Sequence, residues 1–151
     1  MNDERGRAAL ARIAERRVPV VLAQRVEDPR QRHAWDRAED LTIDALLEAA
    51  KAHPTLRFLL VNWSGLDGAR LAAAGLKGRC LVDFARMQVL VRSEVARFIA
   101  AMGVEALAFG SHLPFDYVGP SLVKLSNLET LPAADHEKIA WRNAATFLGL
   151  E

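Results

Sequence analysis

The sequence predicts an α/β protein in which parallel strands alternate with helices, and three observations lead to this prediction. Four short runs are apolar and rich in β-branched or bulky residues, as strands are. Between them lie longer stretches whose apolar residues recur at the helical period. Each apolar run also ends abruptly in polar residues. The runs cover residues 18–23, 57–61, 79–82 and 106–109.

The first helix is expected over residues 3–17, with charged residues opposite a single apolar face. That face is formed by Ala9, Leu10, Ile13 and Ala14. Asn2 or Asp3 can cap the start of the helix through a side-chain oxygen. The strand at 18–23 follows, and Pro19 is acceptable there because it lies near the first residue of the strand.

A long irregular stretch over residues 27–40 is too polar to belong to a core. Loops of this length are usually functional or disordered, and we expect His33 and Trp35 to give this one some packing. Thr42 then caps a helix. The helix is expected to stop before Pro54, because the residue that precedes a proline avoids the helical conformation.

The middle of the chain repeats the pattern of strand and helix. The strand at 57–61 leads to a short helix at about residues 67–74, which closes at Gly75. The strand at 79–82 leads to a helix that ends at Gly103. The apolar stripe of that helix is Val91, Val95, Phe98, Ile99 and Met102.

The last part of the chain begins with the strand at 106–109, which ends in a Gly-Ser-His turn. A short helix is expected over residues 118–126. Pro132 is expected to begin the last helix at its first position, where proline fits best. Gly149 is expected to end it.

Strands that are apolar along their whole length are buried on both faces, which indicates a parallel sheet covered by helices. Two architectures fit this pattern: an open doubly wound sheet, or a (β/α)4 half of a TIM (β/α)8 barrel. No Gly-x-Gly-x-x-Gly or Walker-type loop follows a strand, so nothing indicates nucleotide binding. We expect residues 1–151 to form a single domain.

Composition argues against several classes of partner. The 20 basic and 19 acidic residues give a net charge of +1, which offers no electrostatic reason to expect nucleic acid. Cys80 is the only cysteine, so no internal disulfide or cysteine-based zinc site is possible, and we expect a buried, inert thiol. With no apolar run of membrane-spanning length and no signal peptide, we expect a cytoplasmic protein without a membrane partner.

The polar residues at the strand ends are the main indication of function. All carboxyl ends of a parallel sheet lie on one side, so we expect these residues to converge on one rim. An imidazole, a carboxylate, an arginine and an amide on one rim would make a ligand site. In chain order the residues are Gln24, Arg25, Glu27, Asn62, Asp83, Arg86, Ser111 and His112.

Two of these residues are expected to be catalytic. His112 can act as a general base or a metal ligand near neutral pH, or it can simply hydrogen-bond within its turn. Asp83 can be a ligand, a base or an orienting partner of His112, or it can cap a helix or pair with Arg86. Arg25 suits a substrate carboxylate, or an ion pair with a neighbouring acid. The other substrate-binding candidates are Gln24, Asn62 and Ser111.

Residues 109–115, Phe-Gly-Ser-His-Leu-Pro-Phe, resemble the last strand of the amidohydrolase-related (amidohydrolase family 2) proteins, which typically reads Phe-Gly-Ser-Asp-x-Pro. The tail is also similar to the ends of such proteins, with Asn143-Ala144 followed by Phe-Leu-Gly-Leu at 147–150. Residues 18–30, with the helix that runs into His53, resemble the fifth strand of the family and the helix after it.

The resemblance implies a metal-dependent TIM-barrel enzyme of which this chain is the second half, strands five to eight. In such enzymes metal-activated water hydrolyses an amide, ester or lactone, or the same site decarboxylates a small acid. The resemblance further implies a small-molecule substrate and a divalent metal such as zinc. It makes His112 the acid/base or a metal ligand, Asp83 the partner of His112, and Arg25 a substrate anchor.

The chain departs from the family at its ligand positions. The His-x-His pair of the first strand is absent, and His112 stands where an aspartate is usual. Gln24 and Asn62 occupy the ligand positions of the fifth and sixth strands. One histidine and one carboxylate fall short of the three protein ligands usual at a catalytic zinc. The alternative function is therefore a non-catalytic binding module or degenerate half-barrel, whose rim binds a small anionic ligand without metal.

A half-barrel would have two open strand edges, whose unpaired backbone groups favour pairing with another chain. We therefore expect a homodimer, or pairing with a separate N-terminal half-barrel.

Overall fold

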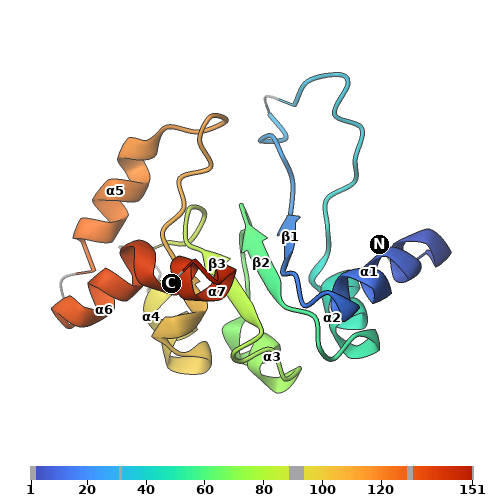
Figure 1. Ribbon diagram of the computed structural model, residues 1–151. Coiled ribbons are helices and arrows are strands. Elements are labelled where there is room, and N and C mark those ends of the chain that lie inside the picture. Colours follow the sequence, from blue (N-terminus) through green and yellow to red (C-terminus); the bar gives the residue numbers. More distant parts are fainter. Residues whose placement is uncertain (1–2, 31, 89–93, 129–130, 151) are drawn as a thin grey trace.

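The computed structural model describes residues 3–30, 32–88, 94–128 and 131–150. Its strands are β1 (Val20–Ala23), β2 (Phe58–Val61), β3 (Cys80–Asp83) and β4 (Leu107–Ala108). Its longer helices are α1 (Glu4–Glu15), α2 (Ile43–Ala52), α3 (Gly68–Ala73), α4 (Glu94–Met102) and α5 (Val118–Ser126). A 3-10 turn, η1 (Val104–Ala106), precedes β4, and the chain ends in α6 (Ala133–Glu137), the π-helical segment η2 (Lys138–Arg142) and α7 (Asn143–Leu148). Strands and helices thus alternate as predicted (Figure 1).

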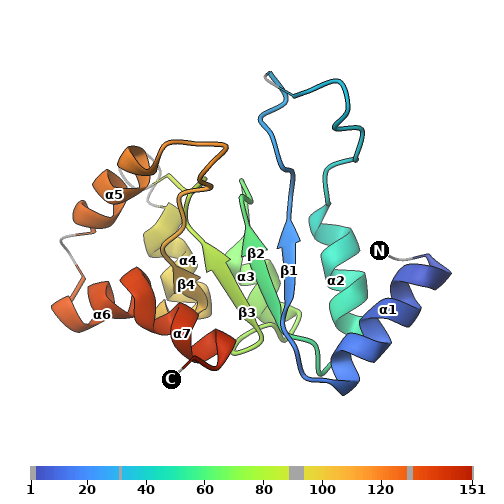
Figure 2. The same ribbon diagram turned by 45° about the horizontal axis from the view of Figure 1, so that its top comes forward.

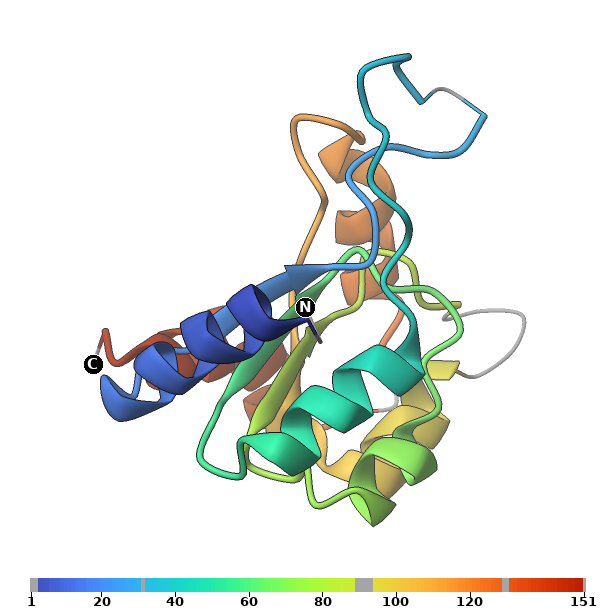
Figure 3. The same cartoon turned by 90° about the vertical axis from the view of Figure 1, so that its right-hand side faces the viewer.

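The four strands pair in parallel in one sheet, in the order β1-β2-β3-β4 (Figure 2). The order follows the chain without the reversal that defines a doubly wound sheet, so that alternative is excluded. The connecting helices α2, α3 and α4 all lie on one side of the sheet (Figure 3). This is the arrangement of a partial (β/α)8 barrel. Among the described helices, none is long and apolar enough to cross a lipid bilayer.

The main core lies between the sheet and helices α2, α3 and α4. Its buried side chains include Leu46, Phe58, Leu60, Leu71, Val82, Val95 and Phe98. Gly68 brings α3 close to α4, because a Cβ at this position would lie 3.1 Å from Cδ2 of Phe98. Cys80 is buried in β3, as the sequence predicts, and burial raises the pKa of its thiol to about 12.

The helix boundaries follow the predicted capping residues. Asp3 accepts a hydrogen bond from the Gly6 amide at 2.8 Å, and Thr42 accepts one from the Ala45 amide at 3.2 Å. Gly149 ends α7 in the left-handed conformation that favours glycine, with φ +71°. Val91, placed in the stripe of α4 by the sequence, lies outside the described residues. Pro132 is the N-cap of α6 rather than its first residue.

The outer edge of β4 is closed by the C-terminal helices. The Phe84 amide donates to the Ala108 carbonyl at 3.1 Å, so this carbonyl faces β3. Backbone groups alternate along a strand, so the Leu107 carbonyl and the Phe109 amide face the other way. Nδ2 of Asn143 donates to the Leu107 carbonyl at 2.8 Å, and the Phe109 amide donates to the Ile139 carbonyl at 2.7 Å. The Leu107 amide donates to the Val104 carbonyl, so three outward groups of this edge are bonded without a neighbouring strand.

The outer edge of β1 is open. The amides of Val20 and Gln24 donate to β2 and its flank, at 2.8 Å to Arg57 and 3.3 Å to Val61. By alternation the backbone groups of Val21 and Ala23 face outward. Within the described part of the chain these groups have no hydrogen-bond partner.

The two edges also differ in how their side chains are covered. Helix α7 contacts β3 and β4 on the face opposite α3, as Figures 1 and 3 show. On that face Leu81 of β3 is buried, whereas Val21 of β1 is 58% exposed. On this face, α7 therefore covers the side chains of β3 and leaves Val21 of β1 exposed.

The segment between β1 and α2 forms an arm that rises beyond the strand ends (Figures 1 and 3). Ion pairs hold it: Arg32 lies 3.2 Å from Asp36 and 2.7 Å from Asp40. The packing expected of Trp35 is wrong, because this side chain is 85% exposed and makes an edge-on contact with His33 alone among the described rings. The arm owes its order to charge rather than to an apolar core.

Candidate functional site

The loops after β1, β3 and β4 enclose a cavity of about 160 Å³ at the carboxyl ends of the strands. It is lined by Glu27, Asp28, Arg86, His112, Phe115 and Asp116. Three of the rim residues expected from the sequence, namely Glu27, Arg86 and His112, therefore face one small space. A cavity below the ~300–1,000 Å³ typical of drug-sized ligands restricts the ligand to a small molecule.

His112 closes this cavity across the sheet. Its ring Nε2 lies 2.6 Å from the Val26 carbonyl, although β4 and β1 are at opposite edges. A carbonyl can only accept, so Nε2 carries a proton, and Nδ1 of the neutral ring keeps its lone pair. His112 also has a φ of +57°, a left-handed conformation that non-glycine residues rarely adopt. The ring is thus held in place with one nitrogen left for chemistry.

Asp83, the last residue of β3, is buried beneath the cavity and does not line it. Its carboxylate accepts hydrogen bonds from the amide of Asn62, at 3.2 and 3.3 Å, and from the amide of Ala85, at 3.2 Å. Burial raises the pKa of Asp83, while those amides and the charges of His112 and Lys124 oppose the shift. Asp83 is a cap for backbone groups and makes no ion pair with Arg86.

Gly110 allows the loop after β4 to pass directly over Asp83. A Cβ at position 110 would lie 2.5 Å from Cβ of Asp83, closer than real Cβ contacts come. The Gly-Ser-His turn found in the sequence therefore has a steric cause as well as a chemical one.

Asn62 connects Asp83 to the cavity wall. It follows β2 with a φ of +58°, and its Nδ2 donates to the Arg25 carbonyl at 2.8 Å. Its Oδ1 accepts a hydrogen bond from Nε of Arg86 at 2.7 Å. The buried carboxyl thus fixes the Asn62 backbone, and the Asn62 amide in turn fixes the guanidinium.

Among the residues that the structure describes, Arg86 is the only arginine that lines the cavity, and its guanidinium lies between two acidic side chains. Its Nη2 lies 3.2 Å from Asp116, and its Nη1 lies 3.7 Å from Asp28. Arg30 hydrogen-bonds Asp28 and holds the pKa of that carboxyl well below its usual range. The described residues that line the cavity supply three carboxylates, one guanidinium and one imidazole. These charges favour an uncharged or cationic ligand over the anionic ligand expected from the sequence for the non-catalytic alternative.

The remaining predicted site residues lie beside the cavity. Nη2 of Arg25 lies 2.6 Å from Oδ2 of Asp40, so this guanidinium forms an ion pair within the arm. Oε1 of Gln24 accepts from the amide and hydroxyl of Ser64, both at 3.1 Å, and joins β1 to the loop after β2. Ser111 accepts from the Leu113 amide at 3.4 Å and lines a neighbouring cavity of about 300 Å³.

The sequence did not single out Asp28 or Asp116 as site residues, and it placed Arg86 on the rim without predicting its contacts with these two acids. The available signal was position: Asp28 follows Glu27, and Asp116 lies in the loop that begins with His112. Both acids were overlooked because they are further from the strand ends than the residues singled out.

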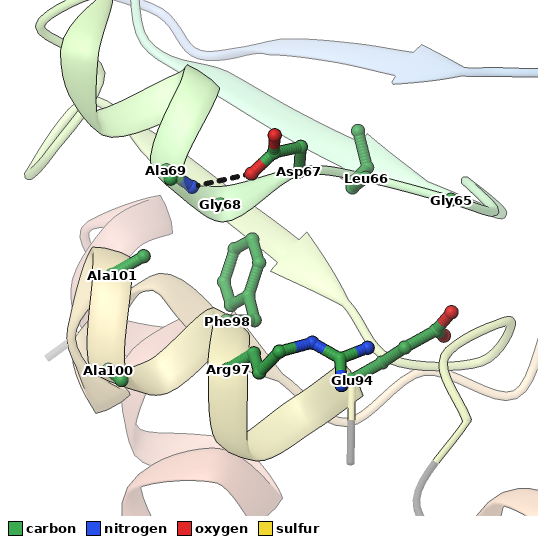
Figure 4. Close-up of a pocket in the computed structure, with 10 residues that line it drawn as sticks. All are labelled: Gly65, Leu66, Asp67, Gly68, Ala69, Glu94, Arg97, Phe98, Ala100 and Ala101. Carbon is green, nitrogen blue, oxygen red and sulfur yellow. Dashed lines mark hydrogen bonds between the residues drawn. The ribbon is translucent and has the colours of Figure 1, made fainter. Parts of the chain in front are cut away.

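A larger cavity of about 700 Å³ lies between α3 and α4 (Figure 4). None of the predicted site residues lines it. Asp67 on its wall caps α3 by accepting from the amide of Ala69 at 2.9 Å (Figure 4). This cavity is a groove in the helical layer and not part of the rim.

The rim residues do not fit the divalent metal that the resemblance implies. In residues 3–30, 32–88, 94–128 and 131–150, no three His, Cys, Asp or Glu side chains are grouped to hold a metal ion. Backbone amides occupy the Asp83 carboxylate, and the guanidinium of Arg86 holds the Asn62 oxygen. The positive charge of Arg86 is thus fixed beside Asn62, one of the residues that would have to bind the metal ion.

Comparisons with known proteins give a likeness in structure alone. No protein-family model matches the sequence, and no curated protein matches it. A candidate amidohydrolase from Staphylococcus aureus is similar in structure, with a TM-score of 0.67 and 13% identity. The similarity covers 97% of this chain and 59% of that one.

A second structural relative is 2,6-dihydroxybenzoate decarboxylase in complex with 2,6-dihydroxybenzoate. It has a TM-score of 0.60 and 15% identity, over 98% of this chain and 56% of that one. This chain therefore spans less than two thirds of the length of either relative. At this level of identity the two likenesses show the fold alone, and that fold is consistent with a partial TIM barrel.

Proposed function

We propose that the rim cavity belongs to a hydrolase of the amidohydrolase type, which cleaves a small neutral amide, ester or lactone. The observation that carries the proposal is the placement of His112 and Arg86, from the ends of different strands, in the wall of one cavity. The strands would correspond to the fifth to eighth of an amidohydrolase barrel. The surplus of carboxylates in the cavity disfavours an acid substrate, so hydrolysis is preferred to decarboxylation.

His112 would act as the general base. Its Nδ1 would take a proton from water as the water oxygen adds to the substrate carbonyl carbon. Arg86 would stabilise the negative oxygen that forms, because its guanidinium is fixed before the reaction. The same proton would then pass from Nδ1 to the leaving nitrogen or oxygen as its bond to carbon breaks. Asp83 would be a positioning residue that acts through Asn62.

The test is a set of initial-rate assays with aryl esters, lactones, anilides and 2,6-dihydroxybenzoate, with a chelator and with added Zn²⁺ or Mn²⁺. His112→Ala should lower kcat by about 100-fold or more, as loss of a general base does. His136→Ala is the matched control, since its Nε2 also bonds a backbone carbonyl, that of Leu128, away from the cavity. Equal rates for the wild type and His112→Ala would remove His112 from the mechanism.

The second candidate is the non-catalytic half-barrel that binds a small ligand without metal. It is favoured by the pairing of rim residues with each other, because the guanidinium of Arg86 already bonds Asn62 and lies beside Asp28. A non-catalytic protein would turn over none of the substrates, with or without added metal. A small cationic or hydroxylated ligand would nevertheless raise the melting temperature of the wild type more than that of Asp116→Asn.

A further inference from the structure

We propose that two copies of this chain associate through the open edge of β1, which makes one continuous sheet across a two-fold axis. The inference is independent of the proposed reaction. It rests on the contrast between the two ends of the sheet.

The β1 edge is well suited to pairing. Its residues, Val20–Ala23, contain no charge and no proline. The outward backbone groups of Val21 and Ala23 have no hydrogen-bond partner in the described residues, and Val21 is 58% exposed. Proteins usually protect such an edge with a lysine, a proline, a bulge or a covering segment. Within β1 itself none of these is present.

The closed edge of β4 identifies the occupant as a second copy. A complementary half-barrel would need to pair with β1 and β4 together in order to close a barrel. The outward carbonyl of Leu107 is already bonded to Asn143, and the outward amide of Phe109 is already bonded to Ile139. For the same reason copies cannot stack head to tail into a filament. One open edge that pairs with itself gives a closed dimer.

The two-fold axis makes the strands antiparallel. Val21 of one copy then lies opposite Ala23 of the other, and the two outward-facing pairs exchange about four backbone hydrogen bonds. The inward bonds of β1 to β2 remain in place, since they belong to alternate residues.

The test compares two substitutions of equally exposed valines. Val21→Lys places a charge on the β1 edge, while Val123→Lys places one on α5, where the valine is 56% exposed. Light scattering coupled to size exclusion should give twice the 16.7 kDa of one chain for the wild type and for Val123→Lys. Val21→Lys should show half that mass with an unchanged circular dichroism spectrum. A monomeric wild type, a dimeric Val21→Lys or a monomeric Val123→Lys would each overturn the proposal.

Hydrogen exchange of the wild type gives a readout that needs no variant. The amides of Val21 and Ala23 should exchange slowly at high protein concentration and quickly on dilution. The Leu22 amide, which faces β2, is the internal control and should be protected at both concentrations. Fast exchange of Val21 and Ala23 at every concentration would contradict pairing at this edge.

Discussion

The two edge strands of the sheet are treated in opposite ways by the chain. The edge of β4 is only two residues long, and a side-chain amide and a helix carbonyl satisfy its backbone. The edge of β1 is longer, apolar and bare. The C-terminal helices thus bond outward backbone groups of β4, as a further barrel strand would. In the described chain, no segment bonds the outward backbone groups of β1. A partial barrel can therefore finish one side by itself and leave the other for association.

The largest expected effect tests how β1 is held to the rest of the sheet. Trp63 is fully buried, and its Nε1 donates to the Leu22 carbonyl at 2.9 Å. Trp63→Ala should lower the free energy of unfolding by about 3–5 kcal/mol, measured by urea titration. Trp35→Ala, at the exposed tryptophan of the arm, should change it by less than about 0.5 kcal/mol. If Trp63→Ala lowered the free energy of unfolding as little as Trp35→Ala does, the attachment of β1 would not depend on Trp63.

The next effect tests the closed edge. Nδ2 of Asn143 donates to the carbonyls of Val104 and Leu107, both at 2.8 Å. Asn143→Ala leaves the Leu107 carbonyl without a donor, whereas the Val104 carbonyl still accepts from the Leu107 amide, and the change should cost about 1–3 kcal/mol of unfolding free energy. Asn127→Ala removes a similar bond, to the Val123 carbonyl, at an exposed helix end and should cost less than about 0.5 kcal/mol. If both variants lose the same amount, Asn143 does not close the edge.

A smaller effect tests the loop that leaves β4. Gly110→Ala would drive a methyl group into Asp83 and should cost about 1–3 kcal/mol, as overpacking does. Gly119→Ala, where nothing lies within 4 Å of the added Cβ, should stay within about 0.5 kcal/mol of the wild type. Thermal unfolding of both variants in one buffer makes the comparison, and an unchanged Gly110→Ala would mean that the loop can move away.

The smallest effect is a dependence of stability on pH. The pKa of Asp83 is raised above its ordinary value of 3.8, so the folded state holds the proton more tightly than the unfolded state. Its contribution to stability is therefore full below pH 3.8 and is lost as pH rises through the folded pKa. Between pH 3.8 and the folded pKa, the plots of unfolding free energy against pH for the wild type and Asp83→Asn should differ in slope by at most about 1.4 kcal/mol per pH unit. Parallel curves would contradict the shift.

Much of the fold could be predicted because it depends on local signals. Asp3, Thr42 and Gly149 act where their side chains or backbone freedom predict, and the apolar runs became the strands. The convergence of the strand ends followed from parallel pairing alone. These features need only the neighbouring residues and the type of sheet.

The rest depends on contacts between distant parts of the chain. The bond from His112 to Val26 and the closure of β4 by Asn143 join segments that no local pattern relates. Trp35 was expected to pack because aromatic residues usually do, but the arm is held by ion pairs instead. Arg25 was expected to bind substrate or to pair with an acid close in the sequence; it pairs with Asp40, fifteen positions away, and its contact with a substrate stays a prediction.

The bond between His112 and Val26 also bears on the order of folding. It joins residues 86 positions apart and spans the whole width of the sheet, so it can form only after all four strands have docked. Helices and their caps form from near neighbours and come earlier. In a refolding experiment, ligand binding at the rim should consequently return after the helical circular dichroism signal. Under mild denaturant the cavity should be lost while the sheet is still intact.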